Sequence, residues 1–232
     1  RIVEDALHRP ASPRPSKVVY VGGPTGAAWL DRIGVSYQPS DVTGRTADVA
    51  GAGLLLLGPD AALDPAALRA YLEAGGRAFF LPRSQADAGL GVSLKPAAAG
   101  FAGSLSVPAW LEARGLSASD LRWRTDLEPP PWIVSSGAEI GADGLIGRMA
   151  IGKGVAVFCQ VDPDRFQADE KTYFRYTRWR STRAVAQLLA NLGARFPVDR
   201  RVFHPLDSTV LDLNGEWQMK VTLPLPPASS EA

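Results

Sequence analysis

The pattern of apolar and polar residues is clearest in the stretch 53–82. Four consecutive leucines, 54–57, follow a glycine and precede another. An uninterrupted apolar run is typical of a strand buried on both faces of a parallel sheet, because a half-solvated strand alternates apolar and polar residues. A second apolar run follows at 78–81. The two runs therefore predict neighbouring strands of one sheet.

The segment between these runs carries the signals of a helix start, a helix face and a helix stop. Asp64 can accept the free amides of a first turn, and Pro65 stands where a missing N–H costs nothing. Leu68 and Leu72 recur at helical spacing, and Gly75 supplies a left-handed end. A crossover of this length returns parallel and right-handed, so the sequence predicts an α/β fold.

The alternation of strand and helix extends over the first half of the chain. Residues 17–21 predict a strand, the glycine-rich turn 22–26 leads into a helix that Gly34 ends, and residues 35–37 predict a second strand. This order is typical of a doubly wound, flavodoxin-like sheet with helices on both faces. The turn at 22–26 lacks the spacing of a phosphate-binding motif, which favours a simple tight turn over a phosphate cradle.

The second half of the chain predicts a different kind of pairing. Residues 83–107 are rich in Ala, Gly and Ser, which indicates an irregular excursion over a sheet edge. The longest helix is expected at 171–192, with Gly193 after it. Strand-like runs return at 139–140, 145–151 and 155–161, the last two joined by a Gly-Lys-Gly hairpin turn. We therefore expect a mixed sheet, mostly parallel and extended by an antiparallel hairpin.

Three segments are expected along the chain. Residues 1–16 are rich in proline and predict a linker or the end of a preceding element. Residues 17–197 predict the α/β domain. Residues 198–232 predict a C-terminal β segment, the start of a β-sandwich with strands at 200–203 and 210–213, followed by a Pro/Ser tail.

The charge and cysteine content of the chain limit the kinds of partner that it is expected to bind. Lys and Arg number 25 against 24 for Asp and Glu, so no overall field attracts nucleic acid or an anionic membrane. One cysteine excludes an internal disulfide, and two histidines with it form no metal cluster of familiar spacing, so no cofactor or metal is predicted. No apolar run approaches the ~18 residues of a membrane span. The compartment stays open, an exported or periplasmic location included.

Two side chains are candidate nucleophiles. Cys159 lies mid-strand among apolar neighbours, which favours a buried structural thiol over a reactive one. Ser84 follows the strand at 78–81 and needs a basic partner that the chain scarcely offers. Asp162 and Asp164 have the types of a general acid/base pair, but Asp-Pro-Asp after a strand is more typical of turn and cap chemistry.

The first half of the helix at 171–192 mixes cations with aromatic residues, and its binding candidates are Arg175, Arg178, Trp179 and Arg183. Such mixtures occur in proteins that bind single-stranded nucleic acid, which the neutral chain disfavours. We interpret this segment as an interface helix whose arginines pair with a neighbouring domain or with nearby carboxylates. Those carboxylates are Asp162, Asp164, Asp169 and Glu170.

Tryptophans offer an alternative site. Trp110, Trp123 or Trp132, if exposed, could form a stacking platform for sugar rings. Because most tryptophans are largely buried, this carbohydrate-binding role is the less favoured interpretation.

The unit 17–82 resembles the class I glutamine amidotransferase-like fold, including the amidotransferase-like domains that large glycosidases carry without catalysis. The resemblance implies a cysteine in a tight elbow after the strand at 78–81, and a histidine and glutamate downstream. This chain instead reads Leu81-Pro82-Arg83-Ser84-Gln85, and no His-x-Glu follows. What the resemblance implies is therefore a scaffold without catalytic apparatus.

A second resemblance concerns the end of the chain. Residues 210–219, VLDLNGEWQM, resemble the opening strand of the sugar-binding jelly roll of glycoside hydrolase family two, which commonly begins Leu-Asn-Gly-x-Trp. The stretch from the Gly-Lys-Gly turn to the helix end at 187–193 resembles the close of the amidotransferase-like domain that precedes such a jelly roll in some β-galactosidase-like enzymes. The chain, which begins without methionine, is accordingly expected to stop just inside its next domain.

Together these observations predict a non-catalytic structural domain of a glycoside hydrolase, with catalysis outside this segment. Its expected partners are other domains or subunits of the same enzyme, with carbohydrate as a further partner. Two alternatives remain open. One is a self-contained hydrolase or amidotransferase-like enzyme that acts through Ser84 or Cys159, and the other is a carbohydrate-binding module built on tryptophans.

Overall fold

A computed structural model of the 232-residue chain describes residues 17–40, 49, 51–61, 63–84, 88–96, 106–125, 127–128, 130–167 and 171–196. The linker expected at 1–16 and the β-sandwich segment expected at 198–232 lie outside the described residues, as do His8 and His204.

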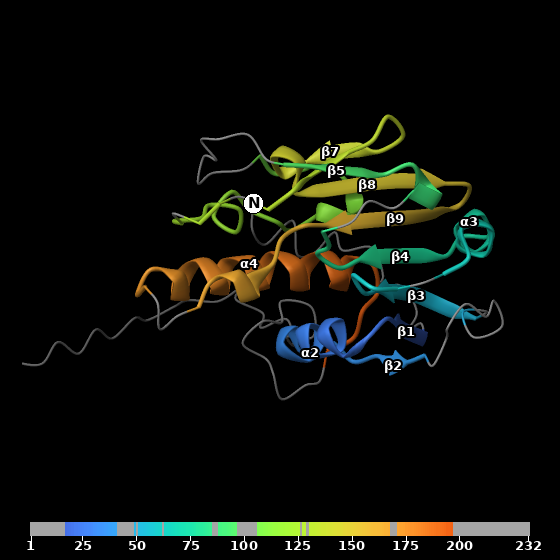
Figure 1. Cartoon of the computed structure of the whole chain (residues 1–232), viewed down its shortest axis with the longest axis horizontal. Coiled ribbons are helices and arrows are strands. Elements are labelled where there is room, and N and C mark those ends of the chain that lie inside the picture. The colour runs from blue at the N-terminus through green and yellow to red at the C-terminus, as the bar shows by residue number, and fades with distance from the viewer. Residues whose placement is uncertain are drawn as a thin grey trace, which may run out of the picture.

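A seven-stranded mixed sheet forms the centre of the domain, in the order β2-β1-β3-β4-β9-β8-β7 (Figure 1). The pairs from β2 to β9 are parallel, and β8 and β7 are added antiparallel. The strands are β1 (Lys17–Val21), β2 (Gln38–Pro39), β3 (Ala52–Leu57), β4 (Arg77–Phe80), β7 (Glu139–Gly141), β8 (Ile146–Ile151) and β9 (Gly154–Cys159). The predicted mixed, mostly parallel sheet is confirmed, and the architecture is consistent with a flavodoxin-like fold.

Helices cover both faces of this sheet. On one face α2 (Pro24–Ile33) and α4 (Phe174–Asn191) pack in one apolar cluster, and on the other α3 (Pro65–Glu73) packs in a second cluster. The four leucines of β3 divide between the clusters, Leu54 and Leu56 in one and Leu55 and Leu57 in the other. The double-sided burial predicted from their continuous run is therefore confirmed.

The predicted helix signals also operate as expected. The Asp64 carboxylate accepts a hydrogen bond from the Ala66 amide at 3.1 Å, which caps α3. Gly34, Gly75 and Gly193 adopt positive φ of 90°, 105° and 96° after α2, α3 and α4. Short 3-10 helices complete the fold: η2 (Ala88–Leu90), η3 (Leu111–Ala113), η4 (Ala142–Gly144) and η5 (Pro163–Arg165).

Two predictions for the connecting segments were wrong. The strand expected at 35–37 is displaced to β2, and Ser36 makes only an isolated bridge to Arg195. The excursion at 83–107 contains an ordered strand, β5 (Ser93–Lys95), which pairs antiparallel with β6 (Trp132–Val134). This pairing joins three-residue strands that lie far apart in sequence, so no local pattern indicates it.

The start of β9 requires glycine. A Cβ atom at Gly154 would lie 2.2 Å from the carbonyl oxygens of both Gly76 and Leu72, which are backbone atoms that cannot swing away. We expect Gly154→Ala to lower the free energy of unfolding by about 1–3 kcal/mol because the α3–β4 connection must shift. Urea denaturation followed by circular dichroism measures this loss.

The matched control is Gly137→Ala, because a Cβ there meets nothing closer than the Met149 methyl at 3.7 Å. Its effect should stay within about 0.5 kcal/mol. Equal losses in the two variants would contradict the proposed contact.

Candidate functional site

The carboxyl ends of the central parallel strands form one edge of the sheet, toward the left in Figure 1. Open α/β sheets commonly bind ligands at this edge. In this chain the edge holds a cleft of about 400 Å³. The polar part of its lining consists of Arg83, Ser84, Glu128, Gln160, Asp162 and Arg165. Of these, only Ser84 and Asp162 were singled out from the sequence.

Arg83 occupies the elbow after β4. Its guanidinium donates hydrogen bonds to the carbonyls of Leu57 at 3.2 Å, Gly58 at 3.0 Å and Leu81 at 3.4 Å. The same group lies 4.7 Å from the centroid of the Phe80 ring. It therefore adds a second donor to the Leu57 and Gly58 carbonyls, which already accept the amides of Leu81 at 2.9 Å and Ala61 at 3.2 Å.

Gln160, which directly follows β9, forms hydrogen bonds with the backbone of this elbow. Its side-chain oxygen accepts from the Arg83 amide at 3.0 Å, and its side-chain nitrogen donates to the Arg83 carbonyl at 2.8 Å. Gln160 is only 3% exposed, and its amide also reaches the Pro131 carbonyl at 3.3 Å. Both backbone polar groups of Arg83 are thus satisfied by one buried side chain, which stabilises the elbow as a structural joint.

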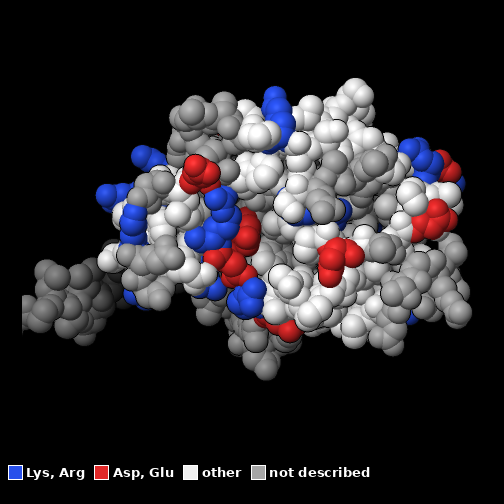
Figure 2. Space-filling view, in the orientation of Figure 1, with Lys and Arg blue, Asp and Glu red and all other residues white. Residues whose placement is uncertain are grey.

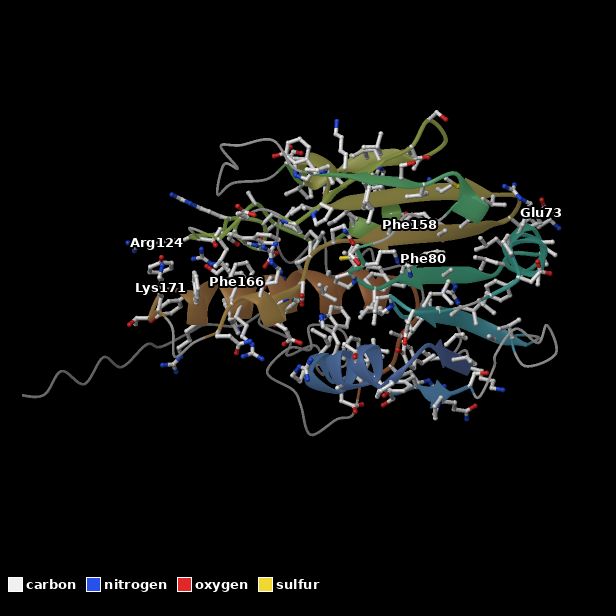
Figure 3. All side chains as sticks on the ribbon, in the orientation of Figure 1. Glu73, Phe80, Arg124, Phe158, Phe166 and Lys171 are labelled. Atoms are coloured by element: carbon white, nitrogen blue, oxygen red, sulfur yellow. The ribbon has the colours of Figure 1, made fainter. Side chains whose placement is uncertain are left out.

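Two aromatic side chains of the core pack next to this elbow. Figure 3 labels Phe80 and Phe158, whose rings stack with centroids 4.2 Å apart. These residues belong to β4 and β9, which pair in parallel register. The stack places a rigid apolar base under the Arg83 guanidinium.

Ser84 is exposed beside the cleft. The described residues include no histidine, and none of them forms a hydrogen bond with its hydroxyl. A serine hydroxyl is a weak nucleophile unless a neighbouring base removes its proton. Nothing in the described part of the chain therefore activates Ser84.

Cys159 is buried in β9 and is 1% exposed. Its thiol lies 3.9 Å from the Val161 carbonyl oxygen. Burial raises the pKa of the thiol from 9.0 to about 12, because the thiolate would lose its hydration. The buried structural thiol favoured by the sequence is confirmed, and a nucleophilic role for Cys159 is inconsistent with this environment.

Asp162 and Asp164 serve the turn after β9. One oxygen of Asp162, Oδ1, accepts from the Asp164 amide at 3.0 Å and from Trp29 Nε1 at 2.9 Å. Asp164 forms ion pairs with Arg32 and with Arg178, the latter at 3.3 Å. The turn-and-cap interpretation is confirmed, as is the pairing of Arg178 with a carboxylate that precedes its helix.

The other candidate arginines of α4 differ in their surroundings. Arg183 pairs with Asp120, which is 3% exposed and also accepts from the Ser117 amide at 2.8 Å. That partner was not anticipated, since it lies on a separate loop. Arg175, by contrast, is exposed. Only part of the predicted arginine set is therefore available for contact with another surface.

The outward face of α4 carries large aromatic side chains. Tyr176 is 61% exposed and Trp179 is 49% exposed. Arg124 stacks on the Tyr173 ring at 4.5 Å, and Figure 3 shows Arg124 near Lys171 at the end of the molecule where α4 begins. Figure 2 shows basic and acidic side chains intermixed over this end of the molecule.

Of the tryptophans proposed as a sugar platform, one is buried and two are half-buried. Trp123 is 4% exposed, which corrects the expectation of an exposed ring; its indole donates to the Asp120 carbonyl at 3.1 Å. Trp110 and Trp132 are half-buried against the main apolar cluster. The indole nitrogen of Trp132 is buried and has no hydrogen-bond partner among the described residues.

Two further features of the described residues bear on function. They contain no group of three or more histidine, cysteine or acidic side chains arranged to hold a metal ion. Among the helices described, none combines the length and apolarity needed to cross a bilayer.

Several residues of the cleft escaped sequence reasoning. Arg83 and Gln160 meet from positions 77 residues apart, and Arg165 reaches Glu128 from 37 residues away. For Arg83, its place after a predicted strand was the available signal. For the others no local signal exists, because their neighbours are set by strand order.

No family model and no curated protein matches the chain, whereas several solved structures resemble it. A β-galactosidase from Halorubrum lacusprofundi shares 15% identity, with a TM-score of 0.43 over 84% of this chain and 33% of that chain. A β-galactosidase from Bacillus circulans sp. alkalophilus shares 10% identity, with a TM-score of 0.41 over 80% of this chain and 32% of that chain. A GMP synthase component from Thermoplasma acidophilum shares 15% identity, with a TM-score of 0.41 over 75% of this chain and 94% of that chain.

The chain spans between 28% and 36% of the length of the glycosidases it resembles, among them an exo-β-1,4-mannosidase from an Opitutaceae bacterium. Similarity of this extent carries no argument about activity. The class is therefore defined by the fold itself, an α/β domain with a mixed, mostly parallel sheet and a cleft at its carboxyl edge.

The role of Arg83 as a structural plug can be tested by stability. We expect Arg83→Met to lower the free energy of unfolding by about 1–3 kcal/mol, because the hydrogen bonds from the charged guanidinium to three carbonyls are lost while the aliphatic stem remains. Chemical denaturation measures the change. Arg69→Met on the exposed side of α3 is the matched control and should stay within about 0.5 kcal/mol.

The burial of Cys159 predicts a protected thiol. At pH 8 the native protein should react with Ellman's reagent at least about 100-fold more slowly than the protein in urea. The folded thiol ionises at about 12 and the unfolded thiol near its ordinary value of 9.0, so the stability that depends on its protonated form is lost as pH rises between these values. Cys159→Ala removes that part of the alkaline loss. Rapid native labelling would contradict the burial.

Proposed function

We propose that this chain is a non-catalytic structural α/β domain of a glycoside hydrolase, with catalysis outside these residues. It holds other domains or subunits of the same enzyme in place. The observation that carries this proposal is the elbow after β4, where Arg83 caps strand ends and Gln160 fixes its backbone. That position, which amidotransferase-like enzymes use for a nucleophile, here has a structural occupant.

The remaining candidate nucleophiles support the same conclusion. Cys159 is 1% exposed and its pKa is raised by burial to about 12, so it carries no thiolate at neutral pH. Ser84 has no basic partner among the described residues. An enzyme that breaks glycosidic bonds with retention needs two carboxylates across a sugar site. In the described part of the chain, Asp162 and Asp164 are instead engaged in capping and ion pairs.

The link to carbohydrate chemistry rests on the sequence motif at 210–219, which resembles the start of a sugar-binding jelly roll. Glycosidases also occur among the structural neighbours, although that degree of similarity adds no weight of its own. The parent activity, its sugar and its linkage are part of the proposal.

The outward face of α4 is the proposed contact surface. It presents Tyr176 and Trp179, 61% and 49% exposed, next to the exposed Arg175. Tyrosine, tryptophan and arginine are the residue types enriched at the centres of protein interfaces. A face of this composition is suited to a neighbouring domain or subunit with its own polar rim.

Activity measurements test the absence of catalysis in this segment. In the gene product that contains this chain, Ser84→Ala and Cys159→Ala should leave the hydrolysis of p-nitrophenyl β-galactoside within about twofold of wild type. Ser93→Ala, at an exposed position on β5, is the matched control. A loss of about tenfold or more in either test variant would show catalysis within the domain and defeat the proposal.

Association measurements test the contact surface. In the same gene product, Trp179→Ala combined with Tyr176→Ser should weaken the association of subunits or domains by about tenfold or more, because buried aromatic anchors dominate interface energies. Analytical ultracentrifugation follows the assembly of subunits, and limited proteolysis follows domain docking. Arg69→Ala on α3 is the control, and unchanged behaviour of the double variant in both measurements would contradict the assignment of this face.

A further inference from the structure

The cleft at the carboxyl edge gathers polar groups that the fold does not use. Asp162, which is half-buried, engages only Oδ1, and no described residue bonds its second oxygen, Oδ2. The Glu128 carboxylate and the Ser84 hydroxyl also have no hydrogen-bond partner among the described residues. Of these groups only Asp162 is partly withdrawn from solvent, where polar groups are normally paired within the protein, whereas Ser84 and Glu128 are exposed. Here the unused groups line one open space of about 400 Å³.

Arg165 contributes hydrogen-bond donors to this cleft. Its guanidinium donates to the Glu128 backbone carbonyl, and within the described residues it forms no ion pair. Burial lowers the pKa of the Arg165 guanidinium, while the charges of Asp162 and Glu128 act in the opposite direction. A half-buried guanidinium held by one carbonyl has hydrogen-bond donors left for a ligand.

The balance of charge selects the kind of ligand. The groups free to contact it are two carboxylates, one guanidinium and one hydroxyl, because the Arg83 guanidinium is already committed to strand-end carbonyls. With the Arg83 guanidinium included, the two carboxylates and two guanidinium groups of the lining cancel, so the cleft has no net charge to attract anions such as phosphate or a uronate. Acceptors and donors side by side instead match a neutral molecule with several hydroxyl groups.

The apolar part of the lining has a suitable composition. The walls of the cleft include the rings of Pro59, Pro82, Pro130 and Pro131. Small-molecule sites typically combine apolar surface with a few well-placed polar groups in volumes of about 300–1,000 Å³. Pyrrolidine rings offer such a surface to the C–H face of a sugar ring, while the polar groups take its hydroxyls.

From this arrangement we infer that the carboxyl-edge cleft is a binding site for a neutral sugar, with Asp162, Glu128 and Arg165 as the groups that hold its hydroxyls. The site is separate from the tryptophan platform considered from the sequence. It goes beyond the proposed function, because it gives this domain a ligand of its own that does not depend on where catalysis occurs.

Trp29 provides a reporter inside the molecule. Its indole N–H donates to Asp162 Oδ1 at 2.9 Å, and the ring is 6% exposed, so solvent additives do not reach it directly. A hydroxyl that donates a hydrogen bond to Asp162 Oδ2 draws electron density away from Oδ1, which changes the chemical shift of the indole proton bound there. Trp179, 49% exposed on α4, reports on stacking at a different surface.

The experiment titrates the ¹⁵N-labelled 232-residue chain with D-galactose and, separately, with D-mannose, and follows the six indole resonances. Assignment uses single Trp→Phe variants. We expect a saturable shift of the Trp29 resonance with at least one of the two sugars, and no comparable shift with sodium phosphate or D-glucuronate. A shift confined to Trp179, Trp110 or Trp132 would overturn the site, and so would the absence of any saturable shift.

Variants separate binding from folding. Glu128→Gln removes an exposed charge that has no partner in the described residues, and Asp162→Asn keeps the size of the capping group. Each should weaken the sugar affinity by about tenfold, the usual effect of losing one hydrogen bond to a charged group. Glu73→Gln is the control, because Figure 3 shows Glu73 at the opposite end of the sheet.

The outcomes distinguish this inference from the proposed function. If Glu128→Gln binds sugar as tightly as wild type while the fold is intact, the cleft is not the site, whatever the parent enzyme hydrolyses. If anions bind more tightly than neutral sugars, the assigned ligand class is wrong. Loss of catalysis in Ser84→Ala would defeat the structural role but leave the sugar titration to stand or fall independently.

Discussion

The hydrogen bonds that close the ends of the parallel strands are the constraint on which this domain depends. The Leu57 and Gly58 carbonyls each accept one backbone amide, from Leu81 at 2.9 Å and from Ala61 at 3.2 Å, and a carbonyl oxygen can accept a second donor. Arg83 donates to Leu57, Gly58 and Leu81 at this edge, and Gln160 satisfies the backbone of Arg83 itself. Strand order β3-β4-β9 brings these groups together.

This arrangement leaves the elbow after β4 without a free nucleophile among the described residues. A nucleophile at an elbow must be free to move toward a substrate and must have a base nearby. The residue at this elbow is instead tied to the backbone of two strands, and the one thiol faces the apolar interior. The cleft at this edge keeps carboxylates and a guanidinium that are the groups of the inferred sugar site.

The sheet and its flanking helices were largely predictable because their signals are local. The continuous leucines of β3 report burial on both faces, Asp64 and Pro65 report a helix start, and Gly75 reports a helix end. Each depends on a few neighbouring residues and on the geometry of one element. The β5–β6 ribbon was missed because Ser93 and Val134 pair across an intervening excursion, and short strands carry too few residues to show a period.

For the candidate site, too, some features could be predicted from the sequence and others only from the structure. The sequence alone determined the type of fold, the absence of a cysteine at the elbow and the apolar surroundings of Cys159, because these follow from neighbouring residues. Only the tertiary structure decided that Arg83 caps strand ends, that Arg183 pairs with Asp120 and that Glu128 and Arg165 face one cleft. The physical reason is that hydrogen bonds and charges act through space over a few ångströms, and strand order sets which distant residues come within that range.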